Sequence, residues 1–260
     1  MLRTAYYEIA DTWAITQRNL KRYLRLPQLL FFSSIQPVIF LTLFNFVFGG
    51  AIGGAKGIPG GLYINFLLPG ILVQTTLFGA LNTGIGLAED MGKGIVDRFR
   101  SLPMSRAAVM AGRTISDMIR NIVVMAIMFT VGTIYGFRFQ DGWVSAIGMF
   151  LSVLLFSFAM SWAAALMGLL VKDSETAQLA GFVFIFPLTF ASAAFVPIET
   201  MPGWLQTFAA NQPVTFAVES ARSLALGTPM NGALWKLGLW IIGILVVFVP
   251  LSIRTYRKRA

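Results

Sequence analysis

The sequence predicts an all-α polytopic membrane protein with six transmembrane helices. Of its 260 residues, 57% are hydrophobic and only 12% are charged, whereas soluble domains carry about 25% charged residues. The charges are clustered, and the uncharged runs between them can each supply the roughly 20 apolar residues that a helix needs to cross a bilayer. Lys and Arg concentrate in alternate segments between these runs, as is typical of multi-span proteins.

The runs divide the chain into two parts. Residues 1–28 form an N-terminal cytoplasmic interface helix, and residues 29–260 form a single six-span transmembrane domain. The predicted spans cover residues 29–49, 62–88 and 121–137, a stretch within 142–171, a stretch within 176–198, and residues 237–253.

The distribution of Lys and Arg predicts the orientation. With both termini in the cytoplasm, 16 of the 20 basic residues lie in cytoplasmic segments and four lie outside. Such a bias is expected because basic residues are retained on the cytoplasmic side. It also explains the net charge of +9, so we expect contact with membrane lipids and no nucleic-acid partner.

Residues 1–28 predict an amphipathic helix in the cytoplasmic interface. Apolar residues recur at helical spacing on one side, and most charged residues lie elsewhere. Pro27 is expected to close this helix before the first span. The alternative is a poorly ordered basic arm. The apolar side consists of Tyr6, Ile9, Trp13, Leu20 and Leu24.

The segment 89–120, between the second and third spans, is dense in charge. Inside it, Ile95, Phe99 and Leu102 fall at i, i+4 and i+7, so a helix here has one apolar face. We expect a short structured cytoplasmic helix that receives a signal or a mechanical push from another protein. The alternative is a helix that only lies on anionic lipid.

The segment 199–236 is too long and too apolar for a plain turn. Pro202 and Pro213 each stand at a suitable first helical position, and Gly227 is a natural stop. We therefore expect two short extracytoplasmic helices between the fifth and sixth spans.

Three other residues of this half have expected roles. Glu219 and Arg222 stand at i and i+3 and are expected to form an ion pair. Pro187 is expected midway along the fifth span, where it removes a backbone donor and kinks the helix. The kink serves either packing or a hinge motion, and the sequence leaves both open.

Several kinds of chemistry are excluded by composition. The chain has no Cys and no His, which excludes disulfides, Cys/His metal sites, thiol nucleophiles and His-based triads. It also has no phosphate-binding G-x-x-x-x-G-K-[ST] motif. We expect no catalytic residue, no metal and no cofactor in this chain.

Acidic residues are absent from the uncharged cores of the predicted spans. Ion-coupled carriers commonly keep ionisable groups at membrane depth, so this absence counts against such a carrier. Asp117 comes closest to a span. It stands four residues after Arg113 and three before Arg120, which predicts a paired charge on the cytoplasmic side.

Polar residues inside the spans have two interpretations. They either line a substrate path or form hydrogen bonds between helices, each worth about 0.6 kcal/mol. The patterns Gly132-x-x-x-Gly136 and Ala164-x-x-x-Gly168 permit close helix packing. The candidate path residues are Gln36, Asn45, Gln74, Thr75 and Asn82.

Three sets of motifs, in order along the chain, resemble ABC exporter permeases of the daunorubicin-resistance type. The first set comprises residues 18–20, Pro27, 36–37 and 48–50; the second comprises 87–90, 94–106 and 112–113; the third comprises 195–197, 199–205, 211–213 and Arg222.

This resemblance implies a permease of a bacterial plasma membrane that pairs as a homodimer or heterodimer. It also implies two copies of a cytoplasmic ATP-binding subunit, which would bind ATP and Mg and drive the export of amphipathic drugs, antibiotics or lipid-like molecules. The charged segment then corresponds to the family's coupling helix. The implied coupling residues are Glu89, Asp90, Gly94, Ile95, Asp97, Arg98, Phe99, Arg100, Leu102 and Pro103.

Alternatives remain open at this level. A polysaccharide or lipo-oligosaccharide exporter uses a similar permease. An ion-coupled carrier would need no ATPase, and a non-transporting scaffold would use the charged segment only to recruit a cytoplasmic protein.

Overall fold

A computed structural model describes residues 2–25, 27–52, 62–95 and 106–259, and its described secondary structure is entirely helical. The helices, in chain order, are α1 (Leu2–Arg25), α2 (Pro27–Ile52), α3 (Tyr63–Gly92), α5 (Arg106–Ile134), α6 (Gly142–Leu170), α7 (Ser174–Phe190), the 3-10 turn η2 (Ile198–Thr200), α8 (Gly203–Ala210), α9 (Pro213–Leu226) and α10 (Ala233–Arg259).

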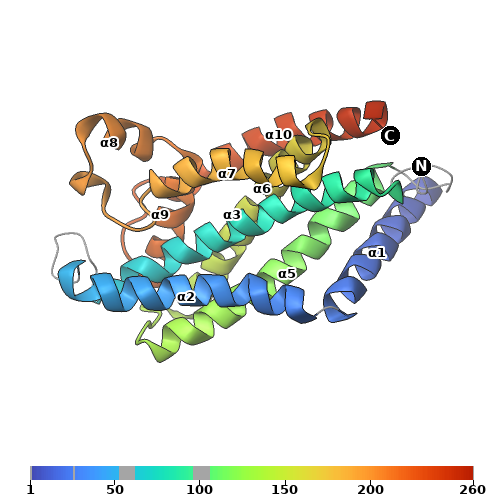
Figure 1. Ribbon diagram of the computed structural model, residues 1–260. Helices are drawn as coiled ribbons and strands as arrows, with labels where there is room; N and C mark the ends of the chain where they lie inside the picture. Colours follow the sequence, from blue (N-terminus) through green and yellow to red (C-terminus); the bar gives the residue numbers. More distant parts are fainter. Residues whose placement is uncertain (1, 26, 53–61, 96–105, 260) are drawn as a thin grey trace.

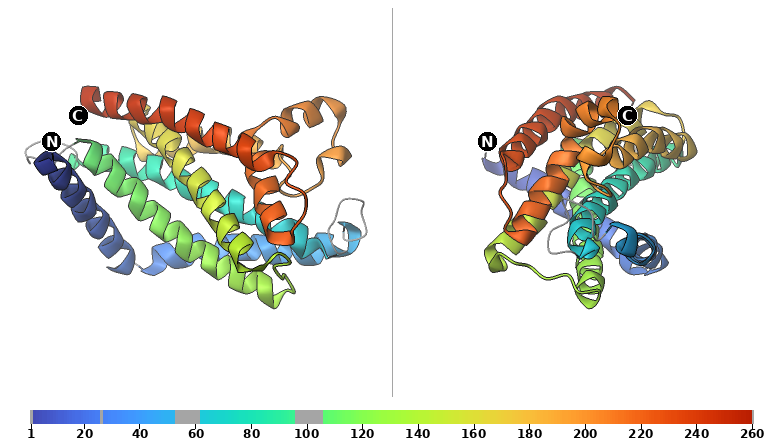
Figure 2. Two further views of the ribbon diagram at one scale, coloured as in Figure 1. Left: turned by 180° about the vertical axis from the view of Figure 1, so that it is seen from behind. Right: turned by 90° about the vertical axis from the view of Figure 1, so that its left-hand side faces the viewer.

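The long helices form one elongated bundle in which the chain runs back and forth. Both termini lie at the same end, where α1 packs beside α5, and α8 and α9 lie at the opposite end (Figures 1 and 2). The predicted interface helix and the predicted outer helices are therefore at opposite ends of the bundle.

Five described helices are long and apolar enough to cross a membrane. These stretches are Ser33–Gly50, Tyr63–Gly92, Ala107–Ile134, Gly142–Leu170 and Ala233–Lys258.

The remaining predicted span, the fifth, corresponds to α7, which has 17 residues. It begins after Asp173, whose carboxylate accepts a hydrogen bond from the Thr176 amide at 2.7 Å. Pro187 lies in its last turn and not midway, as the sequence predicted. The Gln212 side chain donates to the Leu188 carbonyl at 2.9 Å and satisfies the end of the helix.

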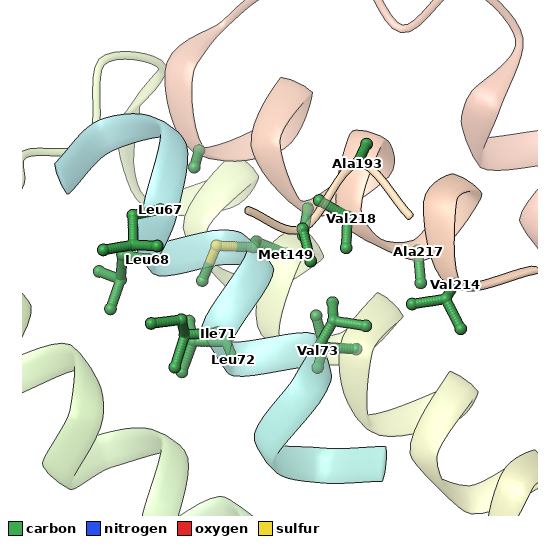
Figure 3. Close-up of a cluster of buried hydrophobic side chains, with 14 of the residues drawn as sticks. Leu67, Leu68, Ile71, Leu72, Val73, Met149, Ala193, Val214, Ala217 and Val218 are labelled. Carbon is green, nitrogen blue, oxygen red and sulfur yellow. The ribbon is translucent and has the colours of Figure 1, made fainter. Parts of the chain in front are cut away.

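α3 is the central helix, and its side chains are buried along almost its whole length. At the outer end, the α3 side chains Leu67, Leu68 and Ile71 are fully enclosed. α6 and α9 pack against them, as Figure 3 shows for Met149, Val214, Ala217 and Val218 among others. The hydrophobic core of the bundle is thus organised around α3.

Small residues bring α3 and α6 into backbone contact. A Cβ added to Gly84 would lie 2.2 Å from the carbonyl oxygen of Ala164, and one added to Gly168 would lie 2.1 Å from that of Gly84. The predicted close packing at Ala164 and Gly168 is therefore confirmed. Gly132 likewise packs against Leu68, but Gly136 lies beyond the end of α5 with φ +99°.

Only the two ends of the segment 89–120, up to Ile95 and from Arg106, are among the described residues, so most of the helix predicted around Phe99 and Leu102 lies outside them. α3 continues through Glu89 and Asp90 to Gly92, and α5 begins at Arg106, well before residue 121. Most of this charged segment thus consists of the ends of two long helices.

Proline and glycine positions set several helix boundaries. α1 ends at Arg25, just before Pro27 as predicted, and Pro27 itself begins α2. The first position of a helix suits proline because its missing N–H is not needed there. α9 begins at Pro213 and ends before Gly227 at φ +65°, as predicted, and α8 begins one residue after Pro202.

The contact between α3 and α6 yields a test. We expect Gly84→Ala to destabilise the protein by about 1–3 kcal/mol, because the added methyl group has no room. Thermal unfolding of the purified protein in detergent measures the loss. Gly238→Ala in α10 is the control, since no atom lies within 4 Å of its added Cβ. Equal unfolding temperatures for the two variants would contradict this packing.

Candidate functional site

The structure describes four of the predicted coupling residues. Glu89 and Asp90 lie in the last turns of α3, Gly94 follows with φ +66°, and Ile95 is helical. The others, Asp97, Arg98, Phe99, Arg100, Leu102 and Pro103, lie outside the described residues.

The two acids at the end of α3 bind neighbouring helices. Glu89 pairs with Lys93 and lies 3.5 Å from Arg22 of α1. Asp90 is buried and pairs with Arg113 of α5. The charged end of α3 is thereby attached to both α1 and α5.

Another ion pair, between Asp117 and Arg120, is buried deeper in the bundle. The side chains of Asp117 and Arg120 are 2% and 6% exposed, and 3.8 Å separates Oδ1 from Nη1. Asp117 also accepts hydrogen bonds from Tyr23 of α1 at 2.7 Å and from Thr83 of α3 at 2.5 Å. One carboxylate therefore joins α1, α3 and α5.

The network extends from Arg120 toward α6. Arg120 Nη2 donates to the Gly79 carbonyl at 2.7 Å and to Asn121 Oδ1 at 3.2 Å. Asn121 donates to Ser157 of α6 at 2.9 Å, and Ser157 donates to the Thr76 carbonyl at 3.1 Å. These bonds supply partners for polar groups that would otherwise be costly inside the bundle.

These contacts correct two expectations. Asp117 pairs with Arg120 as predicted, but Arg113 pairs with Asp90. In addition, Asp117 lies inside the candidate span Ala107–Ile134 and not beside it. A paired carboxylate with two hydroxyl donors is satisfied where it stands, which fits a structural role better than a proton relay.

Tyr23 is held in its protonated form. Burial is the main cause that raises the pKa of Tyr23 to about 12, and the negative charge of Asp117 is the next largest. The phenol therefore keeps its proton at neutral pH and acts as the hydrogen-bond donor to Asp117.

Two adjoining cavities lie beside this network. The chamber is a cavity of about 170 Å³ between α2, α3, α5 and α7. The vestibule, about 380 Å³, lies nearer the termini and is lined by α1, α2, α3 and α5, with Tyr23, Glu89 and Asp117 among its residues.

The chamber brings together four of the five predicted path residues. Gln36 comes from α2, and Gln74, Thr75 and Asn82 come from α3. Asn45 is not among its lining residues.

The chamber also has an aromatic wall, which was not predicted from the sequence. Its members Phe182, Phe186 and Phe190 recur every four residues along α7, and that spacing is a signal the sequence did contain. Phe40 and Phe78 complete the wall.

Another cation, Arg222, stabilises the end of the bundle opposite the termini. The Arg222 guanidinium carbon lies 3.6 Å from the centroid of the Phe66 ring, and Nη2 donates to the carbonyls of Phe66 and Ala193 at 3.1 and 2.9 Å. Burial lowers the pKa of Arg222 to about 10, so it remains charged at neutral pH. The predicted ion pair with Glu219 is wrong at the distance of direct contact: the two described side chains form no salt bridge within 4 Å, although the charge of Glu219 raises the pKa of Arg222.

The chain matches the ABC-2 type transporter family over residues 10–226. The chain belongs to this family. Its long apolar helices are accordingly those of a multi-pass membrane protein.

Two of the proteins that the chain is similar to are named drug-resistance permeases. The chain is 35% identical over 228 residues to the daunorubicin resistance ABC transporter permease protein DrrB1 of Streptomyces coeruleorubidus, covering 86% of this chain and 78% of that one. It is 29% identical over 252 residues to "Probable doxorubicin resistance ABC transporter permease protein DrrC" of Mycobacterium tuberculosis, covering 96% and 89%.

The buried ion pair yields a test. We expect Arg120→Met to destabilise the protein by about 3–5 kcal/mol, because it leaves the Asp117 carboxylate buried without a countercharge. Thermal unfolding in detergent measures the effect.

Lys93→Met is the matched control. It removes one partner of the Lys93–Glu89 pair, whose side chains are 61% and 29% exposed, so we expect a loss of at most about 1 kcal/mol. If the two substitutions lower the unfolding temperature equally, the buried Asp117–Arg120 pair stabilises the protein no more than the exposed Lys93–Glu89 pair does.

Proposed function

We propose that this chain is the membrane subunit of an ATP-driven exporter that moves amphipathic drugs out of a bacterial cell. The observation that carries the proposal is the polar and phenylalanine-lined chamber, which shares four lining residues with a vestibule at the charged end of the bundle. The names of the relatives support the substrate class, since both refer to resistance to a drug.

The proposed topology has six spans and both termini in the cytoplasm of the plasma membrane. The excess of Lys and Arg at the end that holds the termini supports this orientation. α7 would be the fifth span in chain order and would bring the total to six: its 17 residues extend roughly 26 Å, close to the hydrocarbon thickness of about 30 Å.

α1 would lie in the cytoplasmic interface. Ile9, Trp13 and Leu24 are 71%, 53% and 76% exposed, and they lie on one side of α1. An exposed apolar face beside basic residues suits the boundary between headgroups and acyl chains.

The driving force would come from a separate cytoplasmic ATP-binding subunit, present in two copies, which would bind ATP and Mg. This chain would pair with a second permease chain, either identical or different. The segment 89–120 would receive the motion of the ATPase. Its described start at Glu89 and Asp90 contacts α1 and α5, so a displacement there would reach two further helices.

The chamber would hold the substrate during transport. Aromatic rings on α7 suit the apolar body of an amphipathic drug, while Gln36, Gln74 and Asn82 offer hydrogen-bonding groups. Pro187 would act as a hinge near the outer end of α7, beside the ring of Phe190.

The coupling role can be tested at Arg98 and Phe99. We expect the double substitution Arg98→Ala and Phe99→Ala to reduce co-purification with the ATPase subunit or to separate ATP hydrolysis from export, because it removes a charged and an apolar contact. Pull-down and transport in membrane vesicles measure the two effects. Arg257→Ala, near the C-terminus, is a control of the same charge. Full export from vesicles without nucleotide would overturn the ATP-driven proposal.

A substitution in α7 tests whether the chamber binds the substrate. We expect Phe186→Ala to weaken drug binding roughly two- to tenfold, as the loss of one aromatic contact does. Phe184→Ala is the control, because Phe184 is 65% exposed and does not line the chamber. Fluorescence titration of the purified complex with doxorubicin measures both. Equal losses for the two variants would exclude the chamber as the binding site.

A further inference from the structure

The chamber and the vestibule meet at a neck. Among the described residues, the side chains that line both cavities are Ser33, Gln36, Asn82 and Arg120. Arg120 is the largest of them and carries the only charge. The position of its guanidinium therefore has the strongest influence on the width of the neck.

The Arg120 guanidinium stands between the two cavities. Its hydrogen bonds go to Gly79 and Asn121, which line the chamber but not the vestibule. Asp117, which lines the vestibule, is 3.8 Å away and beyond hydrogen-bond distance. Arg120 thus forms hydrogen bonds with the chamber wall, whereas its interaction with Asp117 on the vestibule side is electrostatic only.

Asp117 accepts its hydrogen bonds from two other donors, Tyr23 and Thr83. Thr83 belongs to the enclosed helix α3, but Tyr23 belongs to α1, at the periphery of the bundle. Tyr23 also lies beside Arg120 itself, whose guanidinium carbon is 5.8 Å from the centroid of the Tyr23 ring. Two other contacts of α1, Thr16 Oγ1 to the Gly112 carbonyl at 3.1 Å and Arg22 to Glu89 at 3.5 Å, do not involve a neck residue.

We propose that Tyr23 links the position of α1 to the width of the neck by keeping Asp117 from binding Arg120. When α1 moves away, the buried carboxylate loses a donor, and the cost of an unsatisfied buried acceptor favours a replacement. The closest one is Arg120 Nη1. The guanidinium then moves toward Asp117, releases Gly79 and Asn121, and opens the chamber side of the neck.

The source of the motion rests on the proposed function. Arg22 lies one residue before Tyr23 and contacts Glu89, at the start of the segment that would receive the push from the ATPase. Movement at this segment would therefore be transmitted to α1 and, through Tyr23, to the neck.

The native chain contains no Cys, so a single introduced thiol can report on the neck. Thr75→Cys places a thiol in the chamber, beyond the neck. We expect Tyr23→Phe to raise its rate of reaction with a charged methanethiosulfonate, added from the cytoplasmic side of membrane vesicles, roughly tenfold. This is the shift expected from loss of one hydrogen bond to a charged group.

Two controls separate the neck from general loosening. Tyr135→Phe removes a hydroxyl that lies 2.9 Å from Thr42 Oγ1, outside the network, and should leave the rate unchanged. Asn19→Cys reports on the vestibule and should react equally with and without Tyr23→Phe. An unchanged rate at Thr75→Cys, or an equal rise with Tyr135→Phe, would overturn the proposal.

A double-mutant cycle tests the route through Asp117. In a background of Asp117→Asn, Tyr23→Phe should have no further effect, because the two act through one contact. A full effect of Tyr23→Phe in that background would refute the route. These measurements need neither nucleotide nor a partner subunit, so their failure is distinct from failure of the ATP-driven export proposal, which is judged by transport.

Discussion

A carboxylate enclosed in a bundle of membrane helices must be given hydrogen-bond donors, and the packing of α1, α3 and α5 is organised around that requirement. Asp117 accepts hydrogen bonds from Tyr23 of α1 and from Thr83 of α3, and Arg120 lies beside it. Removal of any of these partners leaves a polar group that neither lipid nor apolar side chains can satisfy. The register of the three helices is therefore restrained by chemistry as well as by shape.

α3 combines two kinds of surface that a transport protein needs together. Toward α6 it presents Gly84, which permits contact between backbones and gives a rigid attachment. Toward α2 and α7 it presents Gln74, Thr75 and Asn82, which line the chamber. A cavity wall made from the most enclosed helix keeps its geometry while the more peripheral helices move around it.

Hydropathy and charge predicted the helical class, the order of the helices and the outer turn at Gly227, because these depend on local composition and backbone preference. The same reasoning placed the start of α5 too late. Asp117 and Arg120 have the i, i+3 spacing of an exposed surface pair, and spacing does not distinguish a buried pair from an exposed one. Their burial depends on Tyr23, which is 94 residues from Asp117 in the sequence and could not be identified without the fold.

The enclosure of α3 has a consequence for biosynthesis. Ribosomes deliver this helix to the bilayer before α5, α6, α7 and α9, the helices that later surround it. During that interval some of its polar side chains lack their partners: the Thr83 hydroxyl, for example, bonds to Asp117 of the later helix α5. Nascent chains that stall after α3 would therefore display a polar membrane segment, which is a feature that cellular quality control can recognise and degrade.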